Sequence, residues 1–346
     1  MTGFRAVVAA VLVAVATTAC TASADNPPAA ADDAARAGAR AFLESYVEPD
    51  GRVVRRDQGG DTVSEGQAYA LLLATAAGDH DRVTRVWRWT AANLRRPDGL
   101  LSWRWVGGKV EDPNSATDAD LDAARALVLA GDRFVDPALA ADGRTLARAV
   151  LDHATVEVAG ERVLVAGNWA TTAPYRVNPS YLSPAATTLL RRATEDPRWD
   201  EVARTGRAQL RSLLATGDLP PDWAQVDDRA RVTPTALDPN PVQYGLDAAR
   251  VAPRFAESCA AEDRTLAAGA APTEDFAAVH ALDGTPRADW QHPLTLVAAA
   301  AADPSHRADL LARAAELDRE TPTYYGAAWA ALGPVLLTTT LLAPCG

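Results

Sequence analysis

Amphipathic helical periodicity recurs between residues 34 and 342 and constrains the fold more than any other feature of the sequence. Apolar residues return every three to four positions, which is the pattern of a helix with one buried face. Short turn segments such as Pro97-Asp98-Gly99 separate the periodic stretches. The pattern predicts helices over residues 34–46, 66–77, 81–94, 119–131, 184–194, 198–215, 245–258, 288–302, 304–317 and 325–341.

Strand patterns are few and short, which argues against a parallel α/β sheet. Alternating valines, Val156 and Val158 and then Val163 and Val165, flank an Ala-Gly-Glu turn and predict one minor β-hairpin. The chain is therefore predicted to be all-α, with its helices in consecutive pairs. Such pairs build either a closed helical toroid or an α-solenoid. No consensus repeats at a fixed period, which disfavours the solenoid.

Charge and residue inventory exclude several classes of function. The formal net charge is −11, and repulsion over most of the surface argues against nucleic acid as a partner. Lys109 is the only lysine, and no GxxxxGK[ST] motif surrounds it, so the chain has no P-loop. The histidines are never three to five residues apart, and HExxH, CxxC and GxSxG motifs are missing. We therefore expect no metal and no cofactor.

The first twenty residues have the features of an export signal. Arg5 precedes an apolar run from Ala6 to Ala16, which is too short to span a bilayer and is typical of a secretory signal peptide. The run ends in T-T-A-C, which is similar to a bacterial lipoprotein cleavage box and predicts lipidation at Cys20. The alternative is an ordinary signal peptide that is cut a few residues later. In both cases we expect an exported protein, either a cell-envelope lipoprotein or a secreted one.

Residues 21–33 are small and polar, include two prolines, and predict a flexible linker ahead of one folded domain over residues 34–346. That domain contains two cysteines, Cys259 and Cys345. In an oxidising compartment they could form a disulfide, and two buried free thiols are the alternative.

Acidic residues gather at two predicted helix starts. Glu65 of the SEGQAY segment has a structural interpretation, as a first-turn acid stabilised by the helix dipole, and a functional one, as a general acid kept protonated by apolar surroundings. Asp118, Asp120 and Asp122 open the next helix, where capping needs only one acid. Asp118 and Asp122 are one turn apart and share a face, whereas Asp120 points elsewhere.

Two further clusters carry polar residues that a simple core does not need. In YRVNPSYLSPAA, a proline-punctuated loop is crowded by Tyr175, Arg176, Asn178 and Tyr181. Aromatic rings mixed with hydrogen-bonding groups suit sugars. In NPVQYGLDAARVAPRF, Asp247 and Arg250 are three residues apart on an otherwise apolar predicted helix. They are either a buried structural ion pair or part of a catalytic site.

Four segments in this order, SEGQAY, SATDADLDAARALVLAGDRF, NPSYLSP and YGLDAARV, closely resemble glycoside hydrolase family 8, which includes bacterial cellulases. The resemblance covers residues 40 to 342, and one position of the central motif departs from the family pattern, because Ala123 stands where Ile or Met is usual. It implies an (α/α)6 barrel of six inner and six outer helices. It also implies inverting hydrolysis of β-1,4-linked glucan, without a cofactor.

The resemblance assigns roles to the acidic residues and their neighbours. Glu65 would be the general acid, Asp247 the general base that activates water, and Asp118 the acid that holds the distorted sugar. Arg250 and Tyr181 would orient the base and its water. Inverting enzymes keep their two carboxyl groups roughly 6.5–9.5 Å apart, so Glu65 and Asp247 must meet across a closed fold.

The remaining substrate contacts are expected from aromatic residues. Trp103 would be a stacking platform, and Tyr324 and Tyr325 match a family pair that lines the cleft. Tyr175 stands where close relatives carry Trp, and Arg176 follows it in the same sugar-binding loop. Trp223 is a weaker candidate for stacking.

The predicted function is therefore an inverting endo-β-1,4-glucanase, with a β-1,4-linked polysaccharide or oligosaccharide as its partner. A xylanase or mixed-linkage β-glucanase of the same family is one alternative, and a non-catalytic glycan-binding lipoprotein is another. We expect a monomer whose only attachment to a membrane is the N-terminal lipid.

Overall fold

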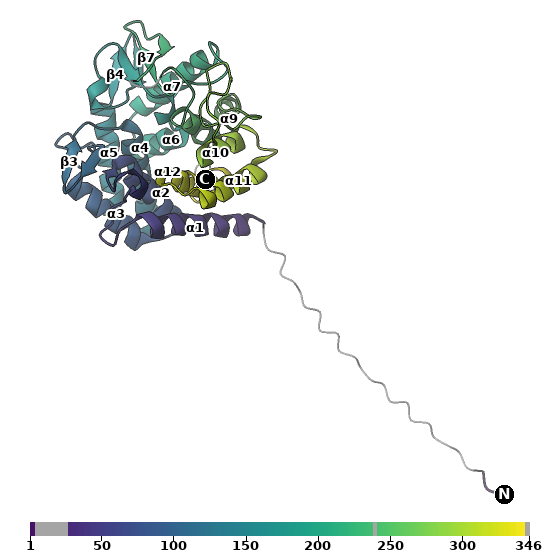
Figure 1. Cartoon of the computed structure of the whole chain (residues 1–346). Coiled ribbons are helices and arrows are strands. Elements are labelled where there is room, and N and C mark those ends of the chain that lie inside the picture. The colour runs from purple at the N-terminus through teal and green to yellow at the C-terminus, as the bar shows by residue number, and fades with distance from the viewer. Residues whose placement is uncertain (4–26, 238–240, 343–346) are drawn as a thin grey trace.

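The computed structural model describes residues 1–3, 27–237 and 241–342, and these contain helices α1 to α12 and strands β1 to β8 (Figure 1). Most of the predicted signal peptide, Cys20 included, lies outside the described residues. Among the described residues, no helix combines the length and apolar character that crossing a membrane requires.

The even-numbered helices form a closed inner ring. Each contacts the next even-numbered helix, and α12 returns to α2. These helices are α2 (Ser64–Ala77), α4 (Thr117–Phe134), α6 (Pro184–Thr194), α8 (Val251–Ala256), α10 (Pro293–Ala302) and α12 (Tyr324–Thr338). Helices α2 and α10 are buried along almost their whole length, because neighbours cover them on every side.

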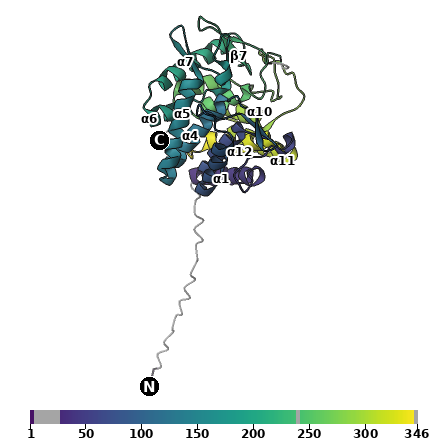
Figure 2. The same cartoon turned by 90° about the vertical axis from the view of Figure 1, so that its left-hand side faces the viewer.

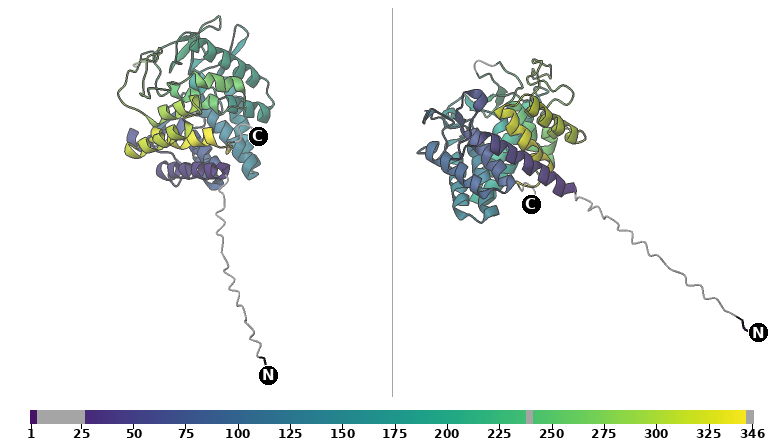
Figure 3. Two further views of the ribbon diagram at one scale, coloured as in Figure 1. Left: turned by 90° about the vertical axis from the view of Figure 1, so that its right-hand side faces the viewer. Right: turned by 60° about the horizontal axis from the view of Figure 1, so that its bottom comes forward.

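The odd-numbered helices surround this ring, and each packs on at least one inner neighbour (Figures 2 and 3). They are α1 (Pro27–Tyr46), α3 (His80–Asn93), α5 (Pro137–His153), α7 (Arg198–Leu214), α9 (Ala261–Ala268) and α11 (Arg307–Glu320). The expected (α/α)6 barrel is confirmed.

Short strands gather into three small sheets. The predicted hairpin is confirmed as β4 (Thr155–Val158) and β5 (Glu161–Leu164), with Val156 opposite Val163. Two three-stranded sheets, which were not predicted, contain β1 (Thr62–Val63), β2 (Arg104–Val106) and β3 (Lys109–Asp112), and β6 (Tyr175–Val177), β7 (Ala224–Val226) and β8 (Val232–Pro234). Most strands of these two sheets have only two or three residues, which is too few to show an alternating pattern. Strands β4 and β7 lie at the opposite end of the molecule from α1 (Figure 1).

Several predicted boundaries need correction. The helix expected over 245–258 is instead a 3₁₀ turn, η4 (Ala248–Arg250), followed by α8 from Val251. Helix α1 begins at Pro27, inside the range predicted to be a flexible linker, because an Ala-rich run has high helix propensity. Helices α5 and α9 were not predicted. Further 3₁₀ turns are η1 (Arg56–Gln58), η2 (Asn168–Ala170) and η3 (Pro179–Tyr181).

Cys259 is disulfide-bonded in the structure, so the alternative of a free thiol is wrong for this residue. Its predicted partner, Cys345, lies outside the described residues.

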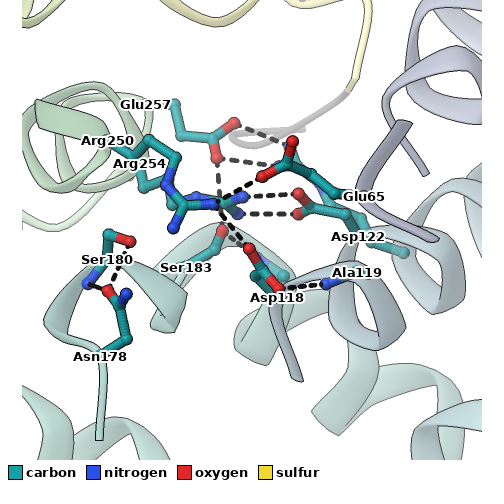
Figure 4. A network of polar contacts seen from close by, with 12 residues as sticks. Glu65, Asp118, Ala119, Asp122, Asn178, Ser180, Ser183, Arg250, Arg254 and Glu257 are labelled. Atoms are coloured by element: carbon teal, nitrogen blue, oxygen red, sulfur yellow. Dashed lines mark hydrogen bonds and ion pairs between the residues drawn. The ribbon is translucent and has the colours of Figure 1, made fainter. Parts of the chain in front are cut away.

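Three arginine–carboxylate pairs cross the barrel between α4 and the η4–α8 segment, and we refer to them as the ladder (Figure 4). The pairs are Arg250–Asp118 at 2.6 Å, Arg254–Asp122 at 2.8 and 2.6 Å, and Arg125–Glu257 at 2.8 Å for both contacts. The partners are 132 residues apart in every pair. The two segments therefore run parallel, in register, with i, i+4 and i+7 positions facing each other.

Loss of one partner in the middle pair should destabilise the fold strongly. Asp122→Ala leaves the buried Arg254 guanidinium without its carboxylate, which costs about 3–5 kcal/mol in buried pairs. The double variant Asp122→Leu/Arg254→Met removes both charges and should lose less than the single variant. Urea unfolding followed by circular dichroism measures both free energies.

A matched control removes a carboxylate from an exposed pair, Arg191–Asp200. Asp200→Ala should change the free energy of unfolding by less than about 1 kcal/mol. If Asp122→Ala costs no more than this control, the ladder does not hold α8 to α4.

Candidate active site

Three acidic side chains meet where the inner helices begin. Glu65 is the second residue of α2, Asp118 is the second residue of α4, and Asp247 precedes η4. Their carboxylates converge on one guanidinium. Arg250 Nη1 donates to Glu65 Oε2 at 3.1 Å and to Asp118 Oδ2 at 2.6 Å, and Arg250 Nη2 donates to Asp247 Oδ1.

The side chains of the two predicted catalytic acids are more exposed than Arg250, the residue that binds both. The side chain of Glu65 is 22% exposed and that of Asp247 is 36% exposed, whereas that of Arg250 is only 1% exposed. A molecule arriving from solvent can therefore reach both acids while the arginine stays fixed beneath them. Because the guanidinium binds both carboxylates, they lie on the same side of the molecule.

The pKa of Glu65 is raised to about 7. Burial is the largest cause, Arg250 opposes the rise, and the negative charges of Asp118 and Asp247 add to it. A carboxylic acid with this pKa still carries its proton near neutral pH. That is the property a general acid requires.

Burial also raises the pKa of Asp247, and Arg250 opposes this rise most strongly. The Asn178 and Trp223 side chains also lower the pKa of Asp247, because they favour its charged carboxylate. Besides Arg250, hydrogen-bonding side chains thus favour the anion of Asp247, whereas the charge of Arg55 favours that of Glu65. The two acids are suited to different roles, one keeping its proton and the other giving it up.

Asp222 fixes the backbone on both sides of Asp247. Its Oδ1 accepts hydrogen bonds from the backbone N–H of Gly245 at 2.8 Å and of Ala248 at 2.9 Å. The backbone approaches so closely that a Cβ atom on Gly245 would lie 2.6 Å from Asp222 Oδ2. A buried carboxylate from another segment thus takes the place of a helix cap for η4.

Tyr181 and Trp223 pack beside this group. The Arg250 guanidinium lies 5.3 Å from the centre of the Tyr181 ring, and the Trp223 ring meets Tyr181 edge-on at 6.1 Å. Tyr181 is positioned by η3, which lies next to η4. Tyr181 and Arg250 are thus neighbours, and their expected role in orienting the base and its water stays a prediction.

Trp103 adjoins Glu65 on another side of the site. Its carbonyl accepts a hydrogen bond from the backbone N–H of Ser64 at 2.9 Å, and its ring is half-buried. The Arg104 guanidinium lies 5.8 Å from the Trp103 ring. The exposed part of the indole can accept a stacked sugar ring.

Two predicted sugar contacts lie further out, on β6. Tyr175 is half-buried opposite Val226 of β7. Arg176 Nη1 donates to Thr235 Oγ1 at 2.8 Å and to the carbonyl of Ala236 at 3.0 Å. This nitrogen therefore holds the segment that follows β8, and it does not join the three acids.

The tyrosine pair at the start of α12 separates into two environments. Tyr325 is partly exposed and close enough to Arg250 for their charges to interact. Tyr324 is only 1% exposed and packs against the Phe42 and Tyr46 rings behind α2. Tyr324 therefore does not present a surface to a bound sugar, contrary to the expectation that both tyrosines line the cleft.

Asp222 and the lower pairs of the ladder were not identified from the sequence. Asp222 adjoins Trp223, but a lone Asp after two prolines usually indicates a turn. The ladder did leave a signal, since Asp118, Asp122 and Arg125 repeat the 4-then-3 spacing of Arg250, Arg254 and Glu257 with complementary charges.

Comparison with known proteins agrees with this geometry. The family model described as glycosyl hydrolases family 8 matches residues 5–267. A probable endoglucanase of Novacetimonas hansenii is 36% identical over 217 residues, which are 61% of this chain and 63% of that protein. An endoglucanase of Cellulomonas uda is 28% identical over 217 residues, which are 61% of this chain and 60% of that protein. The matches thus span less than two thirds of the length of these relatives.

Among solved structures, an endo-β-1,4-glucanase from Acetobacter xylinum superposes with a TM-score of 0.74 at 28% identity. The superposition covers 88% of this chain and 98% of that one. An endoglucanase from Klebsiella pneumoniae has a TM-score of 0.73 at 22% identity, covering 87% and 98% of the two chains, and shows the same fold. The family model covers most of the sequence and the barrel closes as in these structures, so the chain belongs to glycosyl hydrolase family 8.

Proposed function

We propose that the protein is an inverting endo-β-1,4-glucanase in which Glu65 is the general acid and Asp247 the general base. The observation that carries the proposal is the pair of partly exposed carboxylates, Glu65 and Asp247, held on either side of the buried Arg250. The relatives described as endoglucanases support the choice of substrate.

Hydrolysis needs a proton for the leaving oxygen and a base for water. Protonated Glu65 donates its proton to the glycosidic oxygen as the bond to the anomeric carbon breaks. Asp247 takes a proton from water as the water oxygen attacks that carbon from the opposite face. The new hemiacetal therefore has the α-configuration, and the two carboxyl groups exchange protonation states.

Asp118 is suited to hold the sugar at the cleavage point. Its Oδ2 is committed to Arg250, and its Oδ1 accepts from the backbone N–H of Ala119 at 2.9 Å. The carboxylate is thereby fixed in position as a hydrogen-bond acceptor for a sugar hydroxyl. Trp103 and Tyr325, which are both half-buried, are the aromatic residues proposed to stack on the sugar rings.

Removal of either acid should abolish most of the hydrolysis. Glu65→Gln and Asp247→Asn keep the side-chain shape but cannot exchange the proton, so kcat on cellohexaose should fall about 10²- to 10⁴-fold. Reducing-end release measures the rate, and NMR of the first product should show the α-anomer.

Glu44→Gln on the exposed face of α1 is the matched control and should keep wild-type activity. Wild-type rates in either acid variant would overturn the assigned roles. Binding of cellohexaose without cleavage by the wild type would instead favour the glycan-binding alternative. A panel of cellulose, lichenan and xylan separates glucanase action from mixed-linkage glucanase and xylanase action.

The basic limb of the pH profile of kcat/KM should report the ionisation of Glu65. Since the pKa of Glu65 is raised to about 7, kcat/KM should fall as the pH rises through 7 and the proton is lost. Asp118→Asn removes a negative neighbour that raises this pKa, so the basic limb should move to lower pH in that variant. Cellohexaose is the substrate for this experiment because it is uncharged. An unmoved basic limb in Asp118→Asn would contradict this assignment.

We further propose that the protein is exported and carries a lipid on Cys20, which is supported by the apolar segment and the T-T-A-C sequence. Labelled palmitate should be incorporated into the wild type and not into Cys20→Ala. A wild-type protein that is unlabelled and released into the medium would favour the ordinary signal peptide.

A further inference from the structure

Asn178 carries a buried amide nitrogen that the roles described so far do not use. The residue is 5% exposed, and its Nδ2 has no hydrogen-bond partner among the described residues. A buried donor without a partner costs free energy, and such groups often have a functional explanation.

The orientation of this amide is fixed by Ser180. Asn178 Oδ1 accepts from the backbone N–H of Ser180 at 3.0 Å and from its hydroxyl at 2.7 Å. A backbone N–H can only donate, so the amide oxygen must face Ser180 and the nitrogen must face the other way. Figure 4 shows the two residues in this arrangement.

The nitrogen belongs to a segment that lies beside the predicted base. Asn178 precedes η3, Asp247 precedes η4, and these two turns are neighbours. Tyr181 of η3 contacts Arg250 at the end of η4, which fixes the spacing of the two turns. The Asn178 side chain also favours the charged form of Asp247.

We propose that Asn178 is a positioning residue, whose fixed amide N–H donates to the Asp247 carboxylate and aims it at the attacking water. Arg250 holds one side of the carboxylate and Asn178 holds the other. Catalytic hydrogen bonds are often long in a ligand-free site and shorten when substrate binds, so this one forms fully in the substrate complex. The inference rests on the proposed function, and it gives the base Asp247 a second hydrogen-bond donor, Asn178, beside Arg250.

Asn178→Asp separates this role from a purely structural one. The new carboxylate still accepts both hydrogen bonds from Ser180, so the cap of η3 is kept, but the donor is lost and a negative charge faces Asp247. We expect kcat on cellohexaose to fall about 10- to 100-fold, as for loss of one hydrogen bond to a charged group. The acidic limb of kcat/KM should rise by about one pH unit, since a like charge raises the pKa of Asp247.

Other groups also affect the pKa of Asp247, and the variants at Asn178 and Ser180 must leave these groups in place. The charged and titratable neighbours are Arg250, Asp118, Glu65, Asp222, Tyr181 and Tyr325. Asn93→Asp, on the outer helix α3, adds the same charge away from the site and should leave both kcat and the acidic limb unchanged. Ser180→Ala keeps the donor and one of the two bonds that orient it, so it should lower kcat by less than Asn178→Asp does.

A second measurement needs neither activity nor a stable variant at position 178. In the wild type, the ¹H–¹⁵N signal of the Asn178 amide should shift with the titration of Asp247, and Asp247→Asn should abolish this shift. The proposal is overturned if the Asn178 amide signal does not shift when Asp247 titrates. It is also overturned if a folded Asn178→Asp variant keeps the wild-type kcat and the wild-type acidic limb. This titration uses no glucan. Its result can therefore be interpreted even if the glucanase proposal fails.

Discussion

The ladder of arginine–carboxylate pairs across the barrel is the interaction on which the site depends. Helix α8 is only six residues long and follows a 3₁₀ turn, and its apolar packing is mainly against α9 and α10. The ladder adds the paired contacts that fix its register against α4. Its top pair, Arg250–Asp118, also lies at the centre of the candidate active site, so the fold and the site depend on the same arginine.

This arrangement explains why a charged network is tolerated in a barrel core. Each lower pair is doubly hydrogen-bonded, and Glu257 also accepts from the Ser183 hydroxyl at 3.3 Å. Buried ion pairs offset their desolvation only when their geometry is this complete. At the top of the ladder the balance differs, since three carboxylates share one guanidinium. The surplus negative charge there favours retention of a proton, and Glu65 is the acid that retains it.

Much of the fold was predictable because helical periodicity is a local signal. Ten helices were predicted near their observed positions, whereas α5 and the eight-residue helix α9 were not. The identities of Glu65, Asp118, Asp247 and Arg250 followed from motifs. Their joint contact at Arg250 did not, because it depends on how segments more than 100 residues apart come together when the ring closes. The environment of Tyr324 was not predictable for the same reason, since Tyr324 and its neighbour Tyr325 face different surroundings from one helix turn.

Glu65 and Asp118 lie at the starts of α2 and α4, and Asp247 directly precedes η4, so the acids of the proposed mechanism belong to the inner ring and its approach to α8. The small sheets, including the one that carries Tyr175 and Arg176, are attached to the ring but do not belong to it. We therefore expect substitutions in the sheet that carries Tyr175 and Arg176 to disturb Glu65, Asp118 and Asp247 less than substitutions in the ladder do.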